Sequence, residues 1–119
     1  AVGKVIPALL GKLDGIAMRV PTGTGSAVDL VVELKKKVTV EAVNKAMKKA
    51  ADESFGYTED PIVSSDIIGD HHGGVLDAAS TCLLEVDGKQ LVKLIAWYDN
   101  EMGYTAQMVR LAKHIAHQK

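Results

Sequence analysis

The sequence predicts an α+β domain, in which a mostly antiparallel, mixed sheet of about six strands carries helices on one face. Three observations lead to this prediction. Short apolar segments are bounded by turn residues, as strands are. Two longer segments, 40–52 and 102–117, repeat apolar residues at helical spacing. Asp87-Gly88 stands between two strand segments, as in a two-residue hairpin. With 119 residues, the chain is expected to form one domain, 1–119.

The first third of the chain is expected to hold a short helix and a hairpin. Residues 2–9 have helical spacing, and Pro7 should end the helix just before it. Residues 16–20 and 27–34 alternate in hydrophobicity, and a turn-rich segment separates them. We expect these two strands to pair antiparallel with one buried face.

The middle of the chain is expected to hold one helix and little regular structure after it. Thr39 is a suitable N-cap, and Glu41 lies in the first turn, where the helix dipole favours a negative charge. The helix should end near Asp52. The polar segment 52–61 indicates a loop, and residues 62–68 indicate an extended segment that is only partly buried.

The last third is expected to supply three strands and the C-terminal helix. Residues 75–77 and 81–86 indicate short strands on either side of a turn, and the hairpin should pair the second of them with 90–97. The helical pattern 102–117 follows directly. Residues 97–104 therefore form a strand-to-helix junction, where unpaired backbone N–H groups point outward.

Asn100 is the candidate binding residue at this junction. An asparagine side chain offers one acceptor and two donors in a plane, which is the complement of a primary carboxamide. The alternative is that Asp99 or Asn100 only caps the helix that follows. From the spacing alone, capping is the favoured role.

Arg19 is the candidate anion-binding residue. It lies in an apolar segment just before Pro21, where it needs an anion or a carboxylate as a partner. Asp29 or Glu33 on the next predicted strand could form an ion pair with it. From the residues alone, this structural ion pair is the favoured interpretation.

Other polar residues give weaker signals. Cys82 lies among apolar residues of a predicted strand, so a buried and inert thiol is expected. The adjacent His71 and His72 would point apart in an extended chain, and no residues at zinc-ligand spacing surround them, so we expect no metal site. His114 and His117 lie at a helix C-terminus, where the dipole favours positive charge.

The composition argues against several kinds of partner. The net charge of −1 gives no support for binding to nucleic acid or to a membrane surface. No apolar segment approaches the roughly 20 residues that cross a bilayer. The lysine run 35–37 is expected to be a solvated loop. One cysteine cannot form an internal disulfide, which fits a reducing compartment and a cytoplasmic location.

Four motifs carry a family resemblance. They are LDGIAMRVP at 13–21, VDLVVELKK at 28–36, GYTEDPIVSSDIIGD at 56–70 and WYDNEMGY at 97–104. In this order they closely resemble glyceraldehyde-3-phosphate dehydrogenase, in the C-terminal part of its catalytic domain. The resemblance covers essentially the whole chain.

The resemblance implies roles for three residues. Asn100 corresponds to the asparagine that hydrogen-bonds the nicotinamide carboxamide of NAD, and Tyr104 to a tyrosine that packs near the nicotinamide. Arg19 corresponds to an arginine that holds inorganic phosphate or the substrate phosphate. The implied reaction converts glyceraldehyde 3-phosphate, NAD and phosphate to 1,3-bisphosphoglycerate and NADH in glycolysis. The family also implies a homo-oligomer, a tetramer in the parent enzyme.

The resemblance also implies what this chain lacks. The nucleophilic cysteine of the family lies in a Ser-Cys-Thr-Thr-Asn motif that is absent here, and Cys82 does not match it. No G-x-G-x-x-G fingerprint of a dinucleotide-binding fold follows a strand. We therefore expect a C-terminal fragment of the enzyme, with no catalytic residue and no dehydrogenase activity alone. The alternative is a stand-alone scaffold or protein-interaction domain derived from that enzyme.

Overall fold

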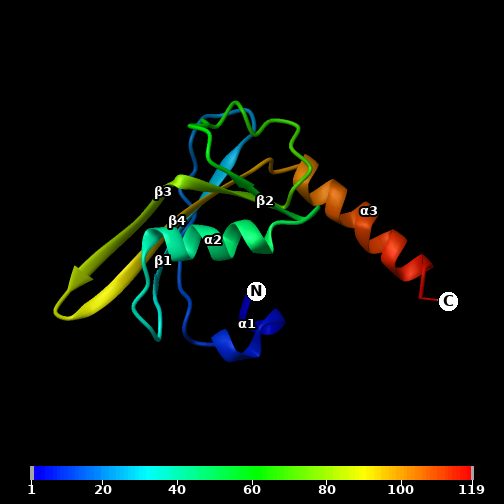
Figure 1. Ribbon diagram of the computed structural model, residues 1–119. Helices are drawn as coiled ribbons and strands as arrows, with labels where there is room; N and C mark the ends of the chain where they lie inside the picture. The colour runs from blue at the N-terminus through cyan, green and yellow to red at the C-terminus, as the bar shows by residue number, and fades with distance from the viewer. Residues whose placement is uncertain (1, 119) are drawn as a thin grey trace.

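The computed structural model describes residues 2–118, and these form the predicted α+β fold around one mixed sheet (Figure 1). Within them the sheet has four strands in the order β1-β4-β3-β2, fewer than the expected six. The elements in chain order are α1 (Val2–Val5), the 3-10 helix η1 (Pro7–Leu9), β1 (Ser26–Glu33), α2 (Val40–Ala50), β2 (Phe55–Thr58), β3 (Gly74–Val86), β4 (Lys89–Tyr98) and α3 (Met102–Ala116).

The hairpin of β3 and β4 is the centre of the sheet and confirms the turn prediction. Asp87 and Gly88 both have positive φ, 49° and 77°, as this turn requires. β1 lies antiparallel to β4 from Ser26 opposite Tyr98 to the other end of the strand. β2 lies parallel to β3. The first residue of β1 therefore lies beside the last residue of β4, close to the start of α3.

The predicted strand at 16–20 is wrong. These residues form no strand, and Ile16 and Met18 are 92% and 84% exposed. The predicted hairpin partner, β1, pairs instead with β4, which offers it an unbroken eight-residue register. The expected buried face of this pair is also wrong. Val28 and Leu30 are exposed, because alternation along a strand shows which residues share a face but not whether anything covers that face.

Two further expectations need correction around β2 and β3. Residues 55–58 lie in the segment expected to be a loop but form β2, because β3 supplies a parallel partner from a distant part of the sequence. The two short strands expected at 75–77 and 81–86 are one strand, β3. Its register shifts between Asp77 and Cys82, so the expected turn is an irregularity within the strand.

The segment 62–68 was expected to be extended, but residues 64–69 form turns. The Asp66 N–H donates to the Val63 carbonyl at 2.9 Å, and the Asp70 N–H donates to the Ile67 carbonyl at 3.0 Å. The turns place the side chain of Ile67 inside, where it is 2% exposed.

The helices follow the predictions. Thr39 caps α2, because its Oγ1 accepts a hydrogen bond from the Ala42 N–H at 3.2 Å. α2 packs against β2 and β3 through its buried Val43, whereas α3 continues from the end of β4 and extends away from the sheet (Figure 1). The first helix also ends before Pro7, as expected, and the 3-10 helix η1 begins at Pro7. None of the described helices is long and apolar enough to cross a bilayer.

The core is small and lies beside β3. Its buried apolar residues are Val43, Ile67, Val75, Leu76, Ala78 and Val92. Much of the remaining apolar surface is exposed, including one side of α3, whose exposed residues are Tyr104, Met108, Leu111 and Ile115. The fold therefore holds the start of α3 firmly and leaves the rest of that helix open.

Candidate functional site

The candidate site is the junction between β4 and α3, together with two loops that bind to it. β4 ends at Tyr98 and α3 begins at Met102, so only three residues connect them. The turn 24–26, which leads into β1, and the loop 69–73, which leads into β3, both hydrogen-bond to this connection. Segments that are far apart in sequence therefore meet at the start of α3.

Asp99 is the residue that holds the junction together. Its side chain is only 5% exposed. Oδ1 accepts hydrogen bonds from the Glu101 and Met102 N–H groups at 2.8 and 2.9 Å. Oδ2 accepts the Gly69 N–H at 2.9 Å. The carboxylate thus satisfies donors at the start of α3, where the helix dipole also favours a negative charge.

These hydrogen bonds fix the charge of Asp99. The N–H donors of Gly69, Met102 and Glu101, in that order of importance, hold the pKa of the carboxyl below its ordinary value. They do so because they stabilise only the ionised form. Asp99 is therefore negatively charged at neutral pH, and its part in the site is structural.

Asn100 turns the other way and binds the turn before β1. The Gly25 N–H donates to Oδ1 at 2.9 Å, and Nδ2 donates to the Ser26 Oγ at 2.7 Å. The Thr24 hydroxyl lies 3.5 Å from Oδ1. The cap of α3 is thus made by Asp99 and not by Asn100. The amide plane of Asn100 is fixed, and one N–H of Nδ2 has no partner among residues 2–118.

Gly25 can make this contact only because it is a glycine. Its φ is +92°, which residues with a side chain rarely adopt. A Cβ at this position would also lie 2.8 Å from the Ser64 carbonyl oxygen. The turn 24–26 is therefore pressed between Asn100 and the turns at 64–69.

Tyr104 lies in the first turn of α3, and its side chain is 68% exposed. The preceding Gly103 is buried against the loop before β3, where an added Cβ would lie 2.6 Å from the His72 carbonyl oxygen. The loop is held by a second contact, from Arg110 Nη1 to the His71 carbonyl at 3.0 Å. The ring of Tyr104 is thus exposed to solvent, on a helix whose first turn is held in place by the loop before β3.

Arg19 lies apart from this network, in the exposed segment before β1. The structural ion pair that was the favoured alternative does not form. Asp29 pairs with Lys93 at 2.9 Å, and Glu33 pairs with Lys89 at 3.5 Å. No ion pair within 4.0 Å involves Arg19 in the part of the chain that the structure describes.

Cys82 is exposed, so the expected buried thiol is wrong. It lies opposite Lys93, beyond the register shift in β3. Its neighbours in sequence are apolar, but a strand is buried only where another layer covers it, and Leu84 in the same part of β3 is exposed as well. The described residues give Cys82 no hydrogen bond.

The histidines show no metal site. His72 Nδ1 lies 2.8 Å from Asp70 Oδ1, and the His72 N–H donates to the same oxygen at 2.7 Å. Between residues 2 and 118 there is no group of three or more His, Cys, Asp or Glu side chains placed to hold a metal ion.

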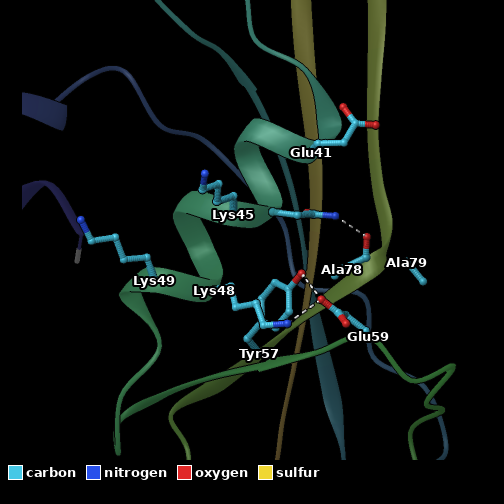
Figure 2. Close-up of a pocket in the computed structure, with 9 residues that line it drawn as sticks. Glu41, Lys45, Lys48, Lys49, Tyr57, Glu59, Ala78 and Ala79 are labelled. Carbon is cyan, nitrogen blue, oxygen red and sulfur yellow. Dashed lines mark hydrogen bonds and ion pairs between the residues drawn. The ribbon is translucent and has the colours of Figure 1, made fainter.

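A groove with a volume of about 740 Å³ lies elsewhere, between α2 and strands β2 and β3. Lys48 Nζ pairs with Glu59 at 2.9 Å, and the Tyr57 hydroxyl donates to the same carboxylate at 3.2 Å. Figure 2 shows both side chains directed at Glu59, whereas Lys45 and Lys49 point away. The groove includes none of the three candidate residues.

Asn100 is a candidate from the sequence alone, but the residues that hold it are not. Ser26 and Gly25 bind its amide, and Gly69 binds the neighbouring Asp99. The signal that the sequence offers is the two glycines at 25 and 69, both of which have positive φ in the structure. They mark sharp turns, but a sequence does not show which distant side chain a turn will meet.

Comparisons with known proteins agree on one enzyme. Residues 1–100 match the family model for the C-terminal domain of glyceraldehyde 3-phosphate dehydrogenase. The chain is 60% identical over 116 residues to a glyceraldehyde-3-phosphate dehydrogenase of Streptococcus pyogenes and 61% identical to one of Clostridium acetobutylicum. These alignments cover 98% of the chain but only 34% and 35% of the relatives. The chain thus spans about a third of the length of the curated relatives it matches.

Proposed function

Because this chain belongs to the glyceraldehyde 3-phosphate dehydrogenase family through its C-terminal domain, we propose that it supplies nicotinamide and phosphate contacts to an NAD-dependent dehydrogenase. The reaction we propose for the assembled enzyme is the oxidation of glyceraldehyde 3-phosphate with NAD and phosphate, giving 1,3-bisphosphoglycerate and NADH in cytoplasmic glycolysis. NAD, when bound, accepts the hydride in such a reaction.

The amide of Asn100 carries this proposal. Asp99 satisfies the start of α3, and the turn 24–26 fixes the amide plane of Asn100. One N–H is left to bind the carboxamide of a nicotinamide. Tyr104 lies in the first turn of α3, four residues after Asn100, and its exposed ring is free to pack beside the pyridine.

Arg19 supports the phosphate contact. The carboxylates of Asp29 and Glu33 are engaged by lysines, so the guanidinium keeps its donors for an anion. Its planar, permanently charged group binds phosphate with two parallel hydrogen bonds. Glyceraldehyde 3-phosphate carries a phosphate group, and inorganic phosphate is the other proposed substrate that this arginine could bind.

We propose that the chain has no dehydrogenase activity by itself. Acyl transfer through a thioester needs a thiolate and a base that activates it. Cys82 lies in β3, and within residues 2–118 no histidine or other base is hydrogen-bonded to it. An assay of the 119-residue chain with glyceraldehyde 3-phosphate, NAD and phosphate should give no turnover above the blank, and measurable turnover would refute this point.

The binding roles are tested in a fusion, in which this chain replaces the matching C-terminal third of the Streptococcus pyogenes relative. We expect Asn100→Ala to raise the KM for NAD about 3- to 10-fold, the cost of one hydrogen bond. Arg19→Ala should raise the KM for phosphate about 10-fold or more, because the lost bonds are charge-assisted. Lys12→Ala removes an exposed cation from the same segment and should change neither constant.

Separate outcomes decide the two roles. If Asn100→Ala leaves the KM for NAD unchanged in an active fusion, the nicotinamide contact is wrong. If Arg19→Ala and Lys12→Ala behave alike, the phosphate contact is wrong.

A second candidate function is a scaffold or interaction domain, and the exposed apolar side of α3 favours it. Met108, Leu111 and Ile115 are all more than half exposed, and exposed apolar surface of this kind marks interaction sites. Sedimentation of the chain alone should then show self-association, as a homo-oligomeric parent would suggest. A monomer at high concentration would count against this candidate.

A further inference from the structure

The contacts of Asn100 determine which end of its amide is free. The Gly25 N–H is a backbone group that can only donate, so the atom facing it at 2.9 Å must be the oxygen, Oδ1. Nδ2 then faces Ser26 Oγ at 2.7 Å and donates to it. The reverse orientation would set two donors against each other at Gly25.

The side chain of Asn100 therefore has a hydrogen-bond donor left for a ligand, on Nδ2. Oδ1 accepts from Gly25 and also lies near the Thr24 hydroxyl, at 3.5 Å. Nδ2 has two hydrogens and uses one of them on Ser26. What Asn100 can offer to a ligand is the second N–H, so it recognises an acceptor.

Ser26 occupies a suitable place for orienting this group. It is the first residue of β1, and its pairing with Tyr98 places it directly beside the end of β4. Its backbone is thus held by the sheet, and its hydroxyl makes the shortest hydrogen bond of Asn100. Gly25 fixes the oxygen end of the amide, and Ser26 fixes the nitrogen end.

We propose that Ser26 is a positioning residue for cofactor binding, acting through Asn100 without touching the ligand. This rests on the proposed function, since it assumes that Asn100 binds the nicotinamide carboxamide. By fixing Nδ2, Ser26 directs the free N–H at the carbonyl oxygen of that carboxamide. A ketone at the same position of the cofactor would satisfy the contact as well as an amide does.

The first test uses the 119-residue chain and NMR of the Asn100 side-chain amide. One of the two Nδ2 hydrogens should exchange slowly with water in the unmodified chain. Ser26→Ala should abolish this protection, and Ser26→Thr, which keeps the hydroxyl, should retain it. Unchanged protection in Ser26→Ala would overturn the proposal.

The second test measures cofactor kinetics in the streptococcal fusion with NAD and with 3-acetylpyridine adenine dinucleotide, which carries a methyl ketone in place of the amide. Ser26→Ala should raise the KM for both about 3- to 10-fold and leave the KM for phosphate unchanged. Ser26→Thr should restore the KM. Ser65→Ala makes the same change at an exposed serine of the turn 64–69 and should have no effect.

The outcomes separate this proposal from the proposed function. If Asn100→Ala raises the KM for NAD and Ser26→Ala does not, the positioning role is wrong and the nicotinamide contact stands. If neither variant changes the KM for NAD, both fail. A purely structural role of Ser26 would lower kcat and change the KM for phosphate as well, and that result would also overturn the proposal.

Discussion

The two segments that carry candidate residues differ in how this chain holds them. At the junction, Asp99 is buried and bound by backbone donors, and Asn100 is bound at both ends of its amide. In the segment 10–21, Ile16 and Arg19 are exposed and no strand forms. Hydrogen bonds with the turn 24–26, which is distant in sequence, therefore place Asn100. No hydrogen bond or ion pair within the described residues holds the side chain of Arg19.

The largest expected difference between the two regions concerns matched isoleucines. Ile67 lies beside the turn at Gly25, where its Cγ2 would be 3.5 Å from an added Cβ, and is 2% exposed, whereas Ile16 is 92% exposed. Ile67→Ala should lower the free energy of unfolding by about 2–5 kcal/mol, because it leaves a cavity. Ile16→Ala should change it by less than about 0.5 kcal/mol. Urea unfolding followed by circular dichroism measures both, and equal losses would show that the two regions are equally well packed.

A matched pair of glycines tests the turn at the junction. Gly25→Ala should destabilise the chain by about 1–3 kcal/mol, because alanine is strained at its positive φ and its Cβ would press on the Ser64 carbonyl oxygen. Gly15 has open space around the position of a Cβ and no positive φ, so Gly15→Ala should be neutral or slightly stabilising. Thermal unfolding gives the comparison. A neutral Gly25→Ala would mean that the turn is not held against residues 64–69.

The charge of Asp99 gives the junction a distinctive dependence on pH. Its pKa is lowered in the folded chain by the N–H donors of Gly69, Met102 and Glu101. The ionised carboxylate therefore stabilises the fold fully above its unfolded pKa, about 3.9, and this stabilisation is lost as the pH falls through the lower folded pKa. Stability measured from pH 6 down to pH 2 should fall along this limb.

Asp99→Asn should make the loss of stability along this acid limb smaller, because the amide does not titrate, whereas Asp52, whose pKa is also lowered by backbone N–H donors, still contributes. The substitution should also weaken the junction at neutral pH, since Nδ2 cannot accept the Gly69 N–H. Asp60→Asn is the matched control, at an exposed aspartate whose side chain makes no hydrogen bond within the described residues. If both variants keep the same acid limb, Asp99 does not control it.

Much of the fold could be predicted because its signals are local. Thr39 caps α2, Asp87-Gly88 turns the hairpin, and the 102–116 pattern forms α3. Each of these depends on a few neighbouring residues. The strand β2 and the partner of β1 depend on pairing between distant segments, which a local pattern does not determine.

The candidate site residues rest on local motifs in a similar way, and their binding roles stay predictions. The family motifs pointed to Asn100, Tyr104 and Arg19, and the helix start pointed to a cap at 99 or 100. The division of labour between Asp99 and Asn100 required the structure, because it depends on where Gly69 and Gly25 arrive. Burial was the least predictable property. Cys82 and Val28 lie in apolar patterns, yet both are exposed.

Amide hydrogen exchange of the 119-residue chain tests the central comparison most directly. We expect slow exchange for the N–H groups of Gly25, Gly69 and Met102, which donate to the side chains of Asn100 and Asp99. We also expect exchange near the unprotected rate for residues 16–20, which form no strand. Slow exchange throughout 16–20, or unprotected N–H groups at Gly25 and Gly69, would contradict this comparison.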